Sequence, residues 1–255
     1  MLNAKISGIA SYLPDYVLTN DELSRMVDTN DEWITTRVGI KERRILKKEV
    51  GSSYMGIQAV KKLLEETGTN PDDVDLLICA TSNPDYRFPS TASVIAHGCG
   101  LEKKCYAYDI QAACAGFIVA SFDANAYIKS CLYKKVIVVC AEKMSSMVNY
   151  EDRATCPLFG DGAAAVLMEP TEEPVGFVDG VFHVDGSGLE HLVYKAGGSA
   201  HPTTHETVDA KENCLYQEGR AVYKSAVMDM LNSSKEVMER NNLKIEDVKW
   251  FVPHQ

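Results

Sequence analysis

Short apolar runs alternate along this chain with longer segments whose apolar residues recur at helical spacing. Residues 76–80 and 136–141 have the Val-, Ile- and Leu-rich composition of strands that are buried on both faces. Residues 53–67 carry apolar side chains at helical spacing, and Gly68 supplies a stop signal. Because strands alternate with helices, the sequence favours a layered α/β fold with parallel strands.

The other expected elements follow from the same periodicities and from capping residues. We expect a short helix near Asp21, capped by Thr19 or Asn20, and a long helix that follows Cys114 and ends at about Ser130. The expected strands are residues 4–12, 76–80, 105–110, 136–141, 163–168, 176–184 and 250–252. The remaining expected helices are residues 31–37, 53–67, 92–99 and 219–240, the last of them amphipathic.

Two segments far apart in the chain resemble each other. Residues 70–81 and 244–255 both follow a long helix, and both read as an acidic cap, an Asp-Val pair and a buried strand. This similarity predicts a structural duplication, although such a short match also arises by chance in α/β proteins. The first copy continues through residues 82–170, and the second copy has no such continuation. We therefore expect a C-terminal truncation of roughly 80 residues, which would leave the last strand unpaired.

Charge and hydropathy argue against several classes of protein. The formal net charge is −10, whereas a general nucleic-acid-binding protein carries a basic footprint. The sequence contains no apolar run of about 18 residues, which a transmembrane helix needs, and its N-terminus lacks the apolar stretch of a signal peptide. We therefore expect no nucleic-acid partner and no membrane partner.

The chain contains eight cysteines, none of them in a C-x-x-C pattern. Zinc and redox templates therefore do not apply. Most of the cysteines lie in apolar segments, where free cysteines behave as small hydrophobic residues. Without an export signal, the reducing cytoplasm is the expected compartment.

Cys114 lies where a predicted strand ends, small residues form a tight turn and a helix begins. The surrounding sequence is Asp109-Ile110-Gln111-Ala112-Ala113-Cys114-Ala115-Gly116-Phe117. The positive end of a helix dipole lowers the pKa of a thiol, and small neighbours leave room for a thioester carbonyl. The pattern suits a nucleophile, and on its own it suits a buried structural cysteine equally well.

His254 directly follows the last predicted strand. Open α/β folds build their sites at the carboxyl ends of strands, and Cys with His is the minimal pair for covalent acyl transfer. A solvent-facing or capping histidine is the alternative interpretation of His254, and it is the simpler one when this residue is taken alone.

Two other patterns predict no site. Gly160-Asp161-Gly162 precedes a strand instead of following one, so it is not a dinucleotide-binding loop. His201 and His205 flank a proline-containing loop, and no carboxylate or cysteine pattern completes a metal site there. We therefore expect no metal.

Five motifs, in order, resemble the β-ketoacyl-acyl-carrier-protein synthase III family along the whole chain. The first is Asp31-Glu32-Trp33-Ile34-x-x-Arg37-x-Gly39-Ile40-x-x-Arg43. The others are Arg87-Phe88-Pro89-Ser90, Ala112-Ala113-Cys114-Ala115-Gly116-Phe117, Phe159-Gly160-Asp161-Gly162-Ala163 and Val252-Pro253-His254-Gln255. The order and spacing of all five are far more specific than any one of them.

The resemblance implies a thiolase-like fold, with two pseudo-repeated halves in a five-layered α/β/α/β/α arrangement. The halves would be residues 1–172, which hold the nucleophile, and residues 173–255, an incomplete second half that stops after His254-Gln255. The family has a Cys–His–Asn triad. Cys114 and His254 match its first two members, whereas the asparagine and a late oxyanion-hole glycine have no counterpart in the chain.

The implied activity is that of an acyltransferase which initiates fatty-acid synthesis. Cys114 would take an acyl group, with acetyl the expected one, from acyl-CoA. Malonyl-acyl-carrier protein would then lose carbon dioxide, and its enolate would attack the acyl-cysteine to give a β-ketoacyl product. The CoA thioester is a substrate, so no resident cofactor is implied, and without the asparagine we expect condensation to be impaired.

The resemblance also assigns binding residues. Trp33 and Arg153 match the pair that sandwiches the adenine of CoA, and Arg37 matches a residue near the CoA phosphates. A purely structural role, anchoring a helix, is the alternative for Trp33.

Four more residues are assigned by the same resemblance. Phe88 resembles a residue that reaches into the acyl pocket of the partner subunit, which implies a homodimer. Phe159 and Tyr223 match pocket or tunnel positions. Lys224 resembles a contact for the acidic carrier protein.

Related enzymes and a different class of function stay open at this point. A quinolone- or olefin-pathway homologue, or a condensing enzyme with another acyl primer, is possible because pocket volume sets acyl choice. Elongating synthases and chalcone-type synthases differ in their motifs. An inactive CoA-binding fragment is the alternative from another class.

Overall fold

The computed structural model describes residues 3–254, which form two compact units. The first unit comprises the chain up to Leu18, Glu42–Ser146 and Gly160–Val178. The second unit comprises Thr19–Lys41, Met147–Phe159 and the chain from Asp179 onward. These units reflect spatial contacts, whereas the predicted boundary after residue 172 concerns a pseudo-repeat, so that boundary stays a prediction.

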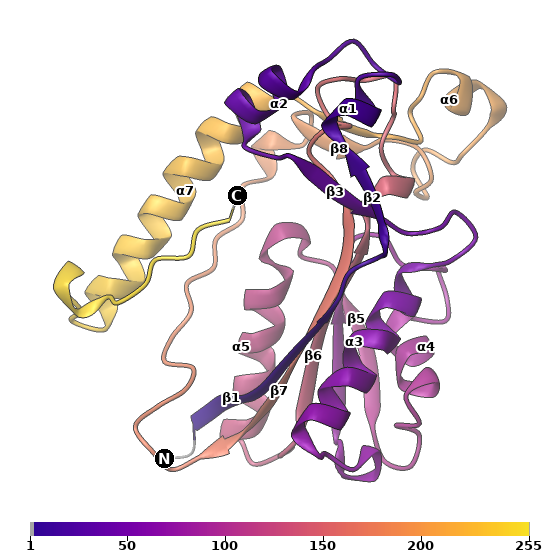
Figure 1. The fold of residues 1–255 in the computed structure, drawn as a ribbon. Coiled ribbons are helices and arrows are strands. Elements are labelled where there is room, and N and C mark those ends of the chain that lie inside the picture. The colour runs from indigo at the N-terminus through magenta and orange to yellow at the C-terminus, as the bar shows by residue number, and fades with distance from the viewer. Residues whose placement is uncertain (1–2, 255) are drawn as a thin grey trace. The chain divides into compact units, whose positions relative to one another are not determined.

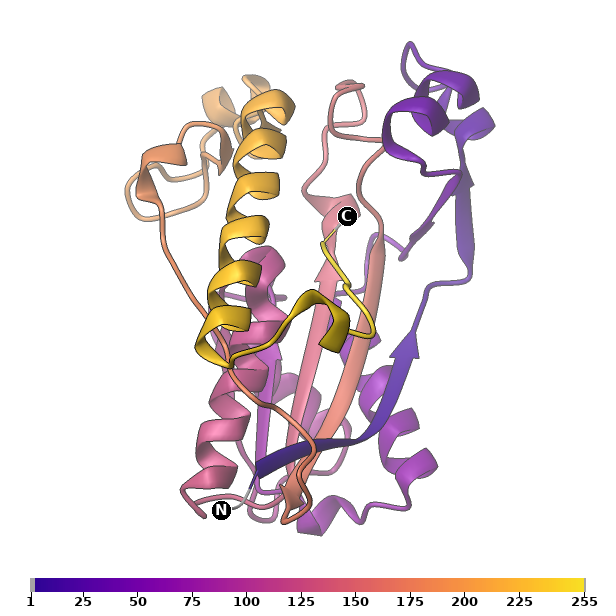
Figure 2. The same cartoon turned by 90° about the vertical axis from the view of Figure 1, so that its left-hand side faces the viewer.

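A five-stranded sheet forms the centre of the first unit, in the order β1-β7-β6-β4-β5. Its strands are β1 (Asn3–Tyr12), β4 (Leu76–Ala80), β5 (Tyr106–Ile110), β6 (Val136–Lys143) and β7 (Asp161–Thr171). Strands β5, β4 and β6 are parallel, as expected, whereas β7 runs antiparallel to both β6 and β1. Figure 2 shows β1, in indigo, running alongside the orange β7.

Helices cover both faces of this sheet and make the first unit a three-layered α/β/α structure (Figure 1). One face packs against α3 (Ser52–Thr67) and α4 (Thr91–Gly98), and the other packs against α5 (Gly116–Lys129). The central strand β4 is buried at every position, which explains its uniformly apolar sequence. Gly68 ends α3 in the left-handed conformation, with φ +62°, as its stop signal predicted.

The second unit contains short elements and one long helix. They are α1 (Asn20–Leu23), α2 (Asp31–Val38), the antiparallel pair β8 (Leu192–Tyr194) and β9 (Leu215–Gln217), α6 (His205–Asp209) and α7 (Gly219–Arg240). Thr19 caps α1 by accepting a hydrogen bond from the Glu22 N–H, which confirms one of the two expected caps. A separate strand pair, all of it in the first unit except Thr19, joins β2 (Tyr16–Thr19) to β3 (Glu42–Ile45).

Two predicted strands are wrong. Residues 176–184 and 250–252 have no strand structure. Gly176 has φ +106°, outside the β region, and the Trp250 side chain is 78% exposed instead of buried. A strand needs a partner for its backbone groups, and an apolar run alone does not supply one.

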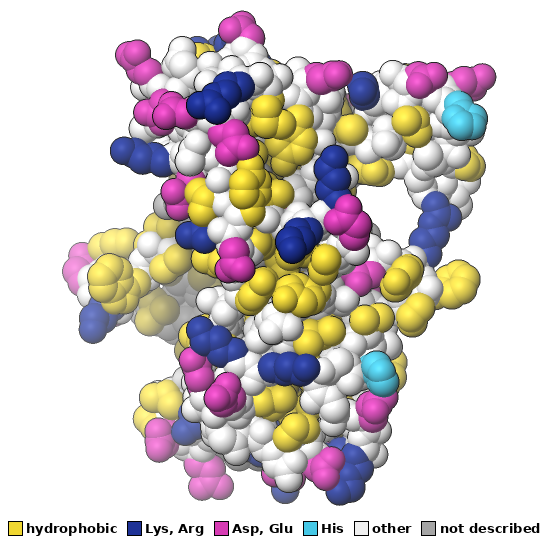
Figure 3. Space-filling model, turned by 45° about the vertical axis from the view of Figure 1, so that its right-hand side comes forward, with side chains coloured by type: hydrophobic (Ala, Val, Ile, Leu, Met, Phe, Trp, Pro, Cys, Tyr) yellow, Lys and Arg dark blue, Asp and Glu magenta, His cyan; other side chains and the backbone are white. Residues whose placement is uncertain are grey.

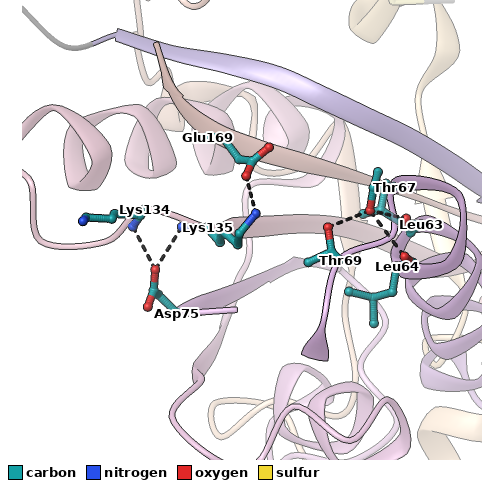
Figure 4. A network of polar contacts seen from close by, with 8 residues as sticks. All are labelled: Leu63, Leu64, Thr67, Thr69, Asp75, Lys134, Lys135 and Glu169. Carbon is teal, nitrogen blue, oxygen red and sulfur yellow. Dashed lines mark hydrogen bonds and ion pairs between the residues drawn. The ribbon is translucent and has the colours of Figure 1, made fainter. Parts of the chain in front are cut away.

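Polar contacts secure the edge of the sheet at which the parallel strands begin (Figure 4). The Asp75 carboxylate accepts hydrogen bonds from the backbone N–H groups of Lys134 and Lys135, both at 2.9 Å, and from Lys104 Nζ at 2.7 Å. Lys135 Nζ in turn donates to Glu169 on β7. These contacts hold β4, β6 and β7 together at one end and leave the opposite edge for the cysteine turn.

Candidate active site

Cys114 lies at the carboxyl edge of the parallel strands, in the turn that joins β5 to α5. A single 3-10 turn, Ala113–Ala115, carries it, and Ala113 has φ +44°, an uncommon value for a residue with a side chain. A Cβ atom at Gly116 would lie 3.0 Å from the Cβ of Ala80 on β4. A small residue at position 116 therefore allows this turn to sit close to the end of the central strand.

Asp109 fixes the strand that leads into this turn. Its two carboxylate oxygens accept hydrogen bonds from the N–H groups of Thr91, at 2.7 Å, and Ala92, at 2.6 Å. These donors are the first residues of α4, where unsatisfied N–H groups favour an anion. The carboxylate thus ties β5, and with it the base of the Cys114 turn, to a second element.

Solvent accessibility separates Cys114 from most of the other cysteines. Cys79, Cys99 and Cys156 are buried, whereas the Cys114 side chain is exposed. Protein around the thiol still removes part of its hydration, and this desolvation, followed by the Glu142 carboxylate, raises the pKa of Cys114. The backbone N–H of Cys114 at this turn does lower the pKa, but desolvation outweighs it, so the predicted net lowering of the Cys114 pKa is not found.

His254 belongs to the second unit and lies in an exposed segment without regular structure. Its predicted position directly after a strand is wrong, because residues 250–252 form no strand. Cys114 belongs to the first unit, so the pairing of Cys114 with His254 stays a prediction.

The second unit brings three of the predicted binding residues together around one indole. The guanidinium carbon of Arg37 lies 4.8 Å from the centre of the Trp33 ring, and that of Arg153 lies 4.7 Å from it. Asn30 caps α2 by accepting a hydrogen bond from the Trp33 N–H at 2.7 Å. Arg153 Nη1 donates to the backbone oxygen of Asp28 at 3.2 Å and to the Asp28 carboxylate at 3.4 Å. Two cations on one aromatic ring form a site suited to a flat, negatively charged ligand.

The remaining predicted residues lie at accessible or half-buried positions. Phe88, in the first unit, is 86% exposed. Tyr223 and Lys224 are exposed on α7, and Phe159 is half-buried; all three belong to the second unit. Their roles in a pocket or in carrier-protein contact stay predictions.

Two acids near these sites were missed from the sequence. Glu142 is the penultimate residue of β6 and contributes to the raised pKa of Cys114, and Asp28 holds Arg153. Glu142 follows Cys140 by two positions, so strand alternation could have placed both on one face. Asp28 has no periodic signal, because it lies in a loop.

Among the residues that the structure describes, no cluster of three His, Cys, Asp or Glu side chains could hold a metal ion. Within the same part of the chain, no helix is long and apolar enough to span a membrane. Lys, Arg, Asp and Glu side chains are interspersed on the face shown in Figure 3.

An accessible cysteine at a strand-to-helix turn of a layered α/β structure is the arrangement that the resemblance to condensing enzymes implies. The family model for 3-oxoacyl-[acyl-carrier-protein] synthase III matches residues 108–186, which include Cys114. The chain is 55% identical to β-ketoacyl-[acyl-carrier-protein] synthase III 2 of Bacteroides thetaiotaomicron over 255 residues, which is 100% of this chain and 76% of the relative. It is also 55% identical to the synthase III of Porphyromonas gingivalis over 257 residues, which again cover 100% of this chain and 76% of the relative.

Solved structures of synthase III enzymes have the same fold as this chain. The synthase III of Aquifex aeolicus superposes with a TM-score of 0.84 at 42% identity, covering 96% of this chain and 74% of that one. The synthase III of Thermus thermophilus gives a TM-score of 0.88 at 37% identity, covering 98% and 76%. The chain belongs to the β-ketoacyl-acyl-carrier-protein synthase III family, and the predicted thiolase-like fold class is confirmed.

Proposed function

We propose that this protein condenses an acyl group from acyl-CoA with malonyl-acyl-carrier protein to give a β-ketoacyl-acyl-carrier protein. Family membership at 55% identity supports this activity. The observation that carries the assignment to residues is the accessible thiol of Cys114 at the β5–α5 turn. Acetyl-CoA is the proposed acyl donor, and related primers of other length are the alternative.

The first stage is acyl transfer to Cys114. Its thiol loses a proton, the sulfur attacks the thioester carbonyl, and CoA leaves as the thiolate, so one thioester replaces another. The raised pKa of Cys114 means that few molecules hold a free thiolate at neutral pH. A base is therefore needed, and His254 is the residue that we assign to this part.

The second stage forms the carbon–carbon bond. Malonyl-acyl-carrier protein loses carbon dioxide, the enolate attacks the acyl-cysteine carbonyl, and Cys114 leaves as the thiolate. In this stage His254 donates a hydrogen bond to the developing enolate oxygen. A preorganised donor of this kind contributes about 3 kcal/mol to transition-state stabilisation.

The Trp33 cluster is the proposed CoA site. A flat indole suits an adenine ring, and the Arg37 and Arg153 guanidinium groups suit adenine stacking and phosphate binding. Lys224, exposed on α7, is the proposed contact for the acidic carrier protein. Phe159 and Tyr223 are the proposed lining of the acyl tunnel.

A homodimer is the proposed assembly. Strand β5 is at the end of the five-stranded sheet, and its first residue, Tyr106, is 60% exposed. Such an edge favours pairing with another chain, and the exposed Phe88 suits a contact across that interface. All eight cysteines are free thiols, which supports a cytoplasmic location.

The direct test is mass spectrometry of the folded protein after incubation with acetyl-CoA. We expect an acetyl adduct of one equivalent on the peptide that contains Cys114, and none in the Cys114→Ala variant. Cys131→Ala is the matched control, because Cys131 is the other exposed cysteine of the described chain and should not affect the adduct. An acetyl group on another cysteine, or none at all, would overturn the role of Cys114.

A second readout distinguishes the complete reaction from partial activity. Addition of malonyl-acyl-carrier protein to the acetylated enzyme should release carbon dioxide and transfer the acetyl group to the β-ketoacyl product. A stable acetyl-Cys114 that is never consumed would favour the alternative, a protein that binds CoA and accepts acyl groups without condensing them.

A further inference from the structure

Asn20 is a buried residue whose side chain contacts both ends of the helix that carries Trp33. It is the first residue of α1 and is only 2% exposed. Its Nδ2 donates one hydrogen bond to Asp31 Oδ1, at the start of α2, and another to the backbone oxygen of Ile40, just after that helix, both at 2.8 Å. One side-chain amide therefore bridges the two ends of an eight-residue helix.

The chemistry of this contact requires an amide. Both partners of Asn20 Nδ2 are oxygen acceptors, and an amide NH2 group has two N–H donors, so each donor has an oxygen of its own. The backbone adds a third contact, because the Asn20 N–H donates to the Lys41 oxygen at 3.3 Å. A carboxylate in place of the amide would set its own oxygens against these acceptors, away from water, which is unfavourable.

The bridged helix has few other points that fix it. Trp33 and Arg37 are four positions apart on α2 and so lie on one face of it, with the Arg37 guanidinium over the indole. Ile34 is the only buried residue of α2. A helix of two turns gains little stability from its own hydrogen bonds. The placement of Trp33 therefore depends on the contacts at the two helix ends, and Asn20 contacts both.

We propose that Asn20 is a positioning residue of the CoA site, which holds α2 so that Trp33 and Arg37 are in place for the bound nucleotide. This inference rests on the proposed function of the Trp33 cluster as the CoA site. Because Asn20 is buried, it acts through the helix and not on the ligand. Loss of the binding arrangement raises the apparent Kd in inverse proportion to the fraction of molecules that keep it.

The test is calorimetric titration of the protein with CoA, which gives the Kd. Asn20→Asp keeps the size of the side chain and replaces two donors with acceptors. We expect it to raise the Kd for CoA about fivefold, which corresponds to α2 in its binding arrangement in about one molecule in five. Asn20→Ala removes the donors without adding repulsion, and it should raise the Kd about twofold.

A merely structural role for Asn20 would have a different kinetic signature. Loss of folded enzyme lowers kcat per mole of protein and leaves the KM of the remaining enzyme unchanged. A displaced α2 should instead raise the KM for acetyl-CoA by the same factor as the Kd and leave kcat within about twofold. A thermal unfolding scan of each variant shows whether it is folded at the temperature of the titration.

Asn241→Asp is the matched control in the same unit. Asn241 Nδ2 also donates to a carboxylate, that of Asp179 at 2.9 Å, and to a backbone oxygen, that of Val237 at 2.8 Å. These contacts lie at the end of α7, which carries none of the three residues of the Trp33 cluster. The control therefore repeats the chemical change and should leave the Kd for CoA unchanged.

The proposal is overturned by an unchanged Kd in folded Asn20→Asp, or by equal shifts in Asn20→Asp and Asn241→Asp. Should Asn20→Asp prove unfolded in the thermal scan, Asn20→Ala is judged by the same criteria. A protein that binds CoA with this dependence on Asn20 but forms no acetyl adduct at Cys114 would overturn only the proposed activity. An adduct without the Asn20 effect would overturn only this inference, and absence of CoA binding would overturn it together with the proposed CoA site.

Discussion

At the scale of single residues, the Trp33 cluster leaves too little space for a ligand as it stands. A ring stacked between the indole and a guanidinium needs about 3.5 Å on each side, or roughly 7 Å in all, whereas Arg153 lies 4.7 Å from the Trp33 centroid. Arg153 must therefore move by about 2 Å and loosen its contacts with Asp28 before adenine can bind there.

Replacement of Trp33 tests this site. We expect Trp33→Ala to raise the KM for acetyl-CoA about tenfold, since it removes a stacking surface worth about 1–2 kcal/mol, and to leave kcat within about twofold. Trp33→Phe keeps a flat ring, so its KM for acetyl-CoA should lie between that of the unaltered protein and that of Trp33→Ala. Steady-state kinetics measure both constants. Equal KM values in Trp33→Ala and the unaltered protein would show that the indole only anchors α2.

At the scale of elements, Asp109 connects the strand before the cysteine turn to α4. We expect Asp109→Ala to lower the free energy of unfolding by about 1–2 kcal/mol, because it leaves two N–H groups at the start of α4 without their acceptor. Asp72→Asn is the control, since Asp72 forms an exposed ion pair with Lys103 and should cost under about 1 kcal/mol. Urea denaturation gives both values, and a cost no larger than that of the control would remove Asp109 from this role.

The elements that sequence predicts correctly are those whose signals are local. Strand β4 matches its predicted bounds, and α7 does as well, because burial and helical spacing are properties of the segment itself. The failed strands at 176–184 and 250–252 depend on a partner strand, which no local pattern reveals. The site divides in the same way. The Cys114 turn was predicted from its own sequence. The contribution of Glu142 to the Cys114 pKa could not be, because it depends on the pairing of β4 with β5 and with β6.

At the scale of the whole molecule, acid stability depends on carboxyl groups with opposite behaviour. Burial alone would raise the pKa of Asp75, but hydrogen bonds from Lys104, Lys135 and Lys134 outweigh it and lower that pKa below its ordinary value. A lowered pKa in the folded state stabilises the fold above the unfolded pKa, near 4, and this contribution is lost as pH falls through the folded value. Glu142, whose pKa burial raises, has the opposite sign: its ionisation costs stability as pH rises from the unfolded pKa through the raised folded-state value.

Thermal unfolding between about pH 3 and pH 7 should therefore separate the two groups. We expect Asp75→Asn to be less stable than the unaltered protein at pH 7 and to lose less stability on acidification, because the proton-linked contribution is gone. Glu142→Gln should show the reverse, with its largest gain in stability at pH 7 and a smaller gain toward pH 4, since the native carboxyl becomes neutral there. Parallel stability curves for the two variants would contradict this assignment, because lowered and raised carboxyl pKa values impose slopes of opposite sign.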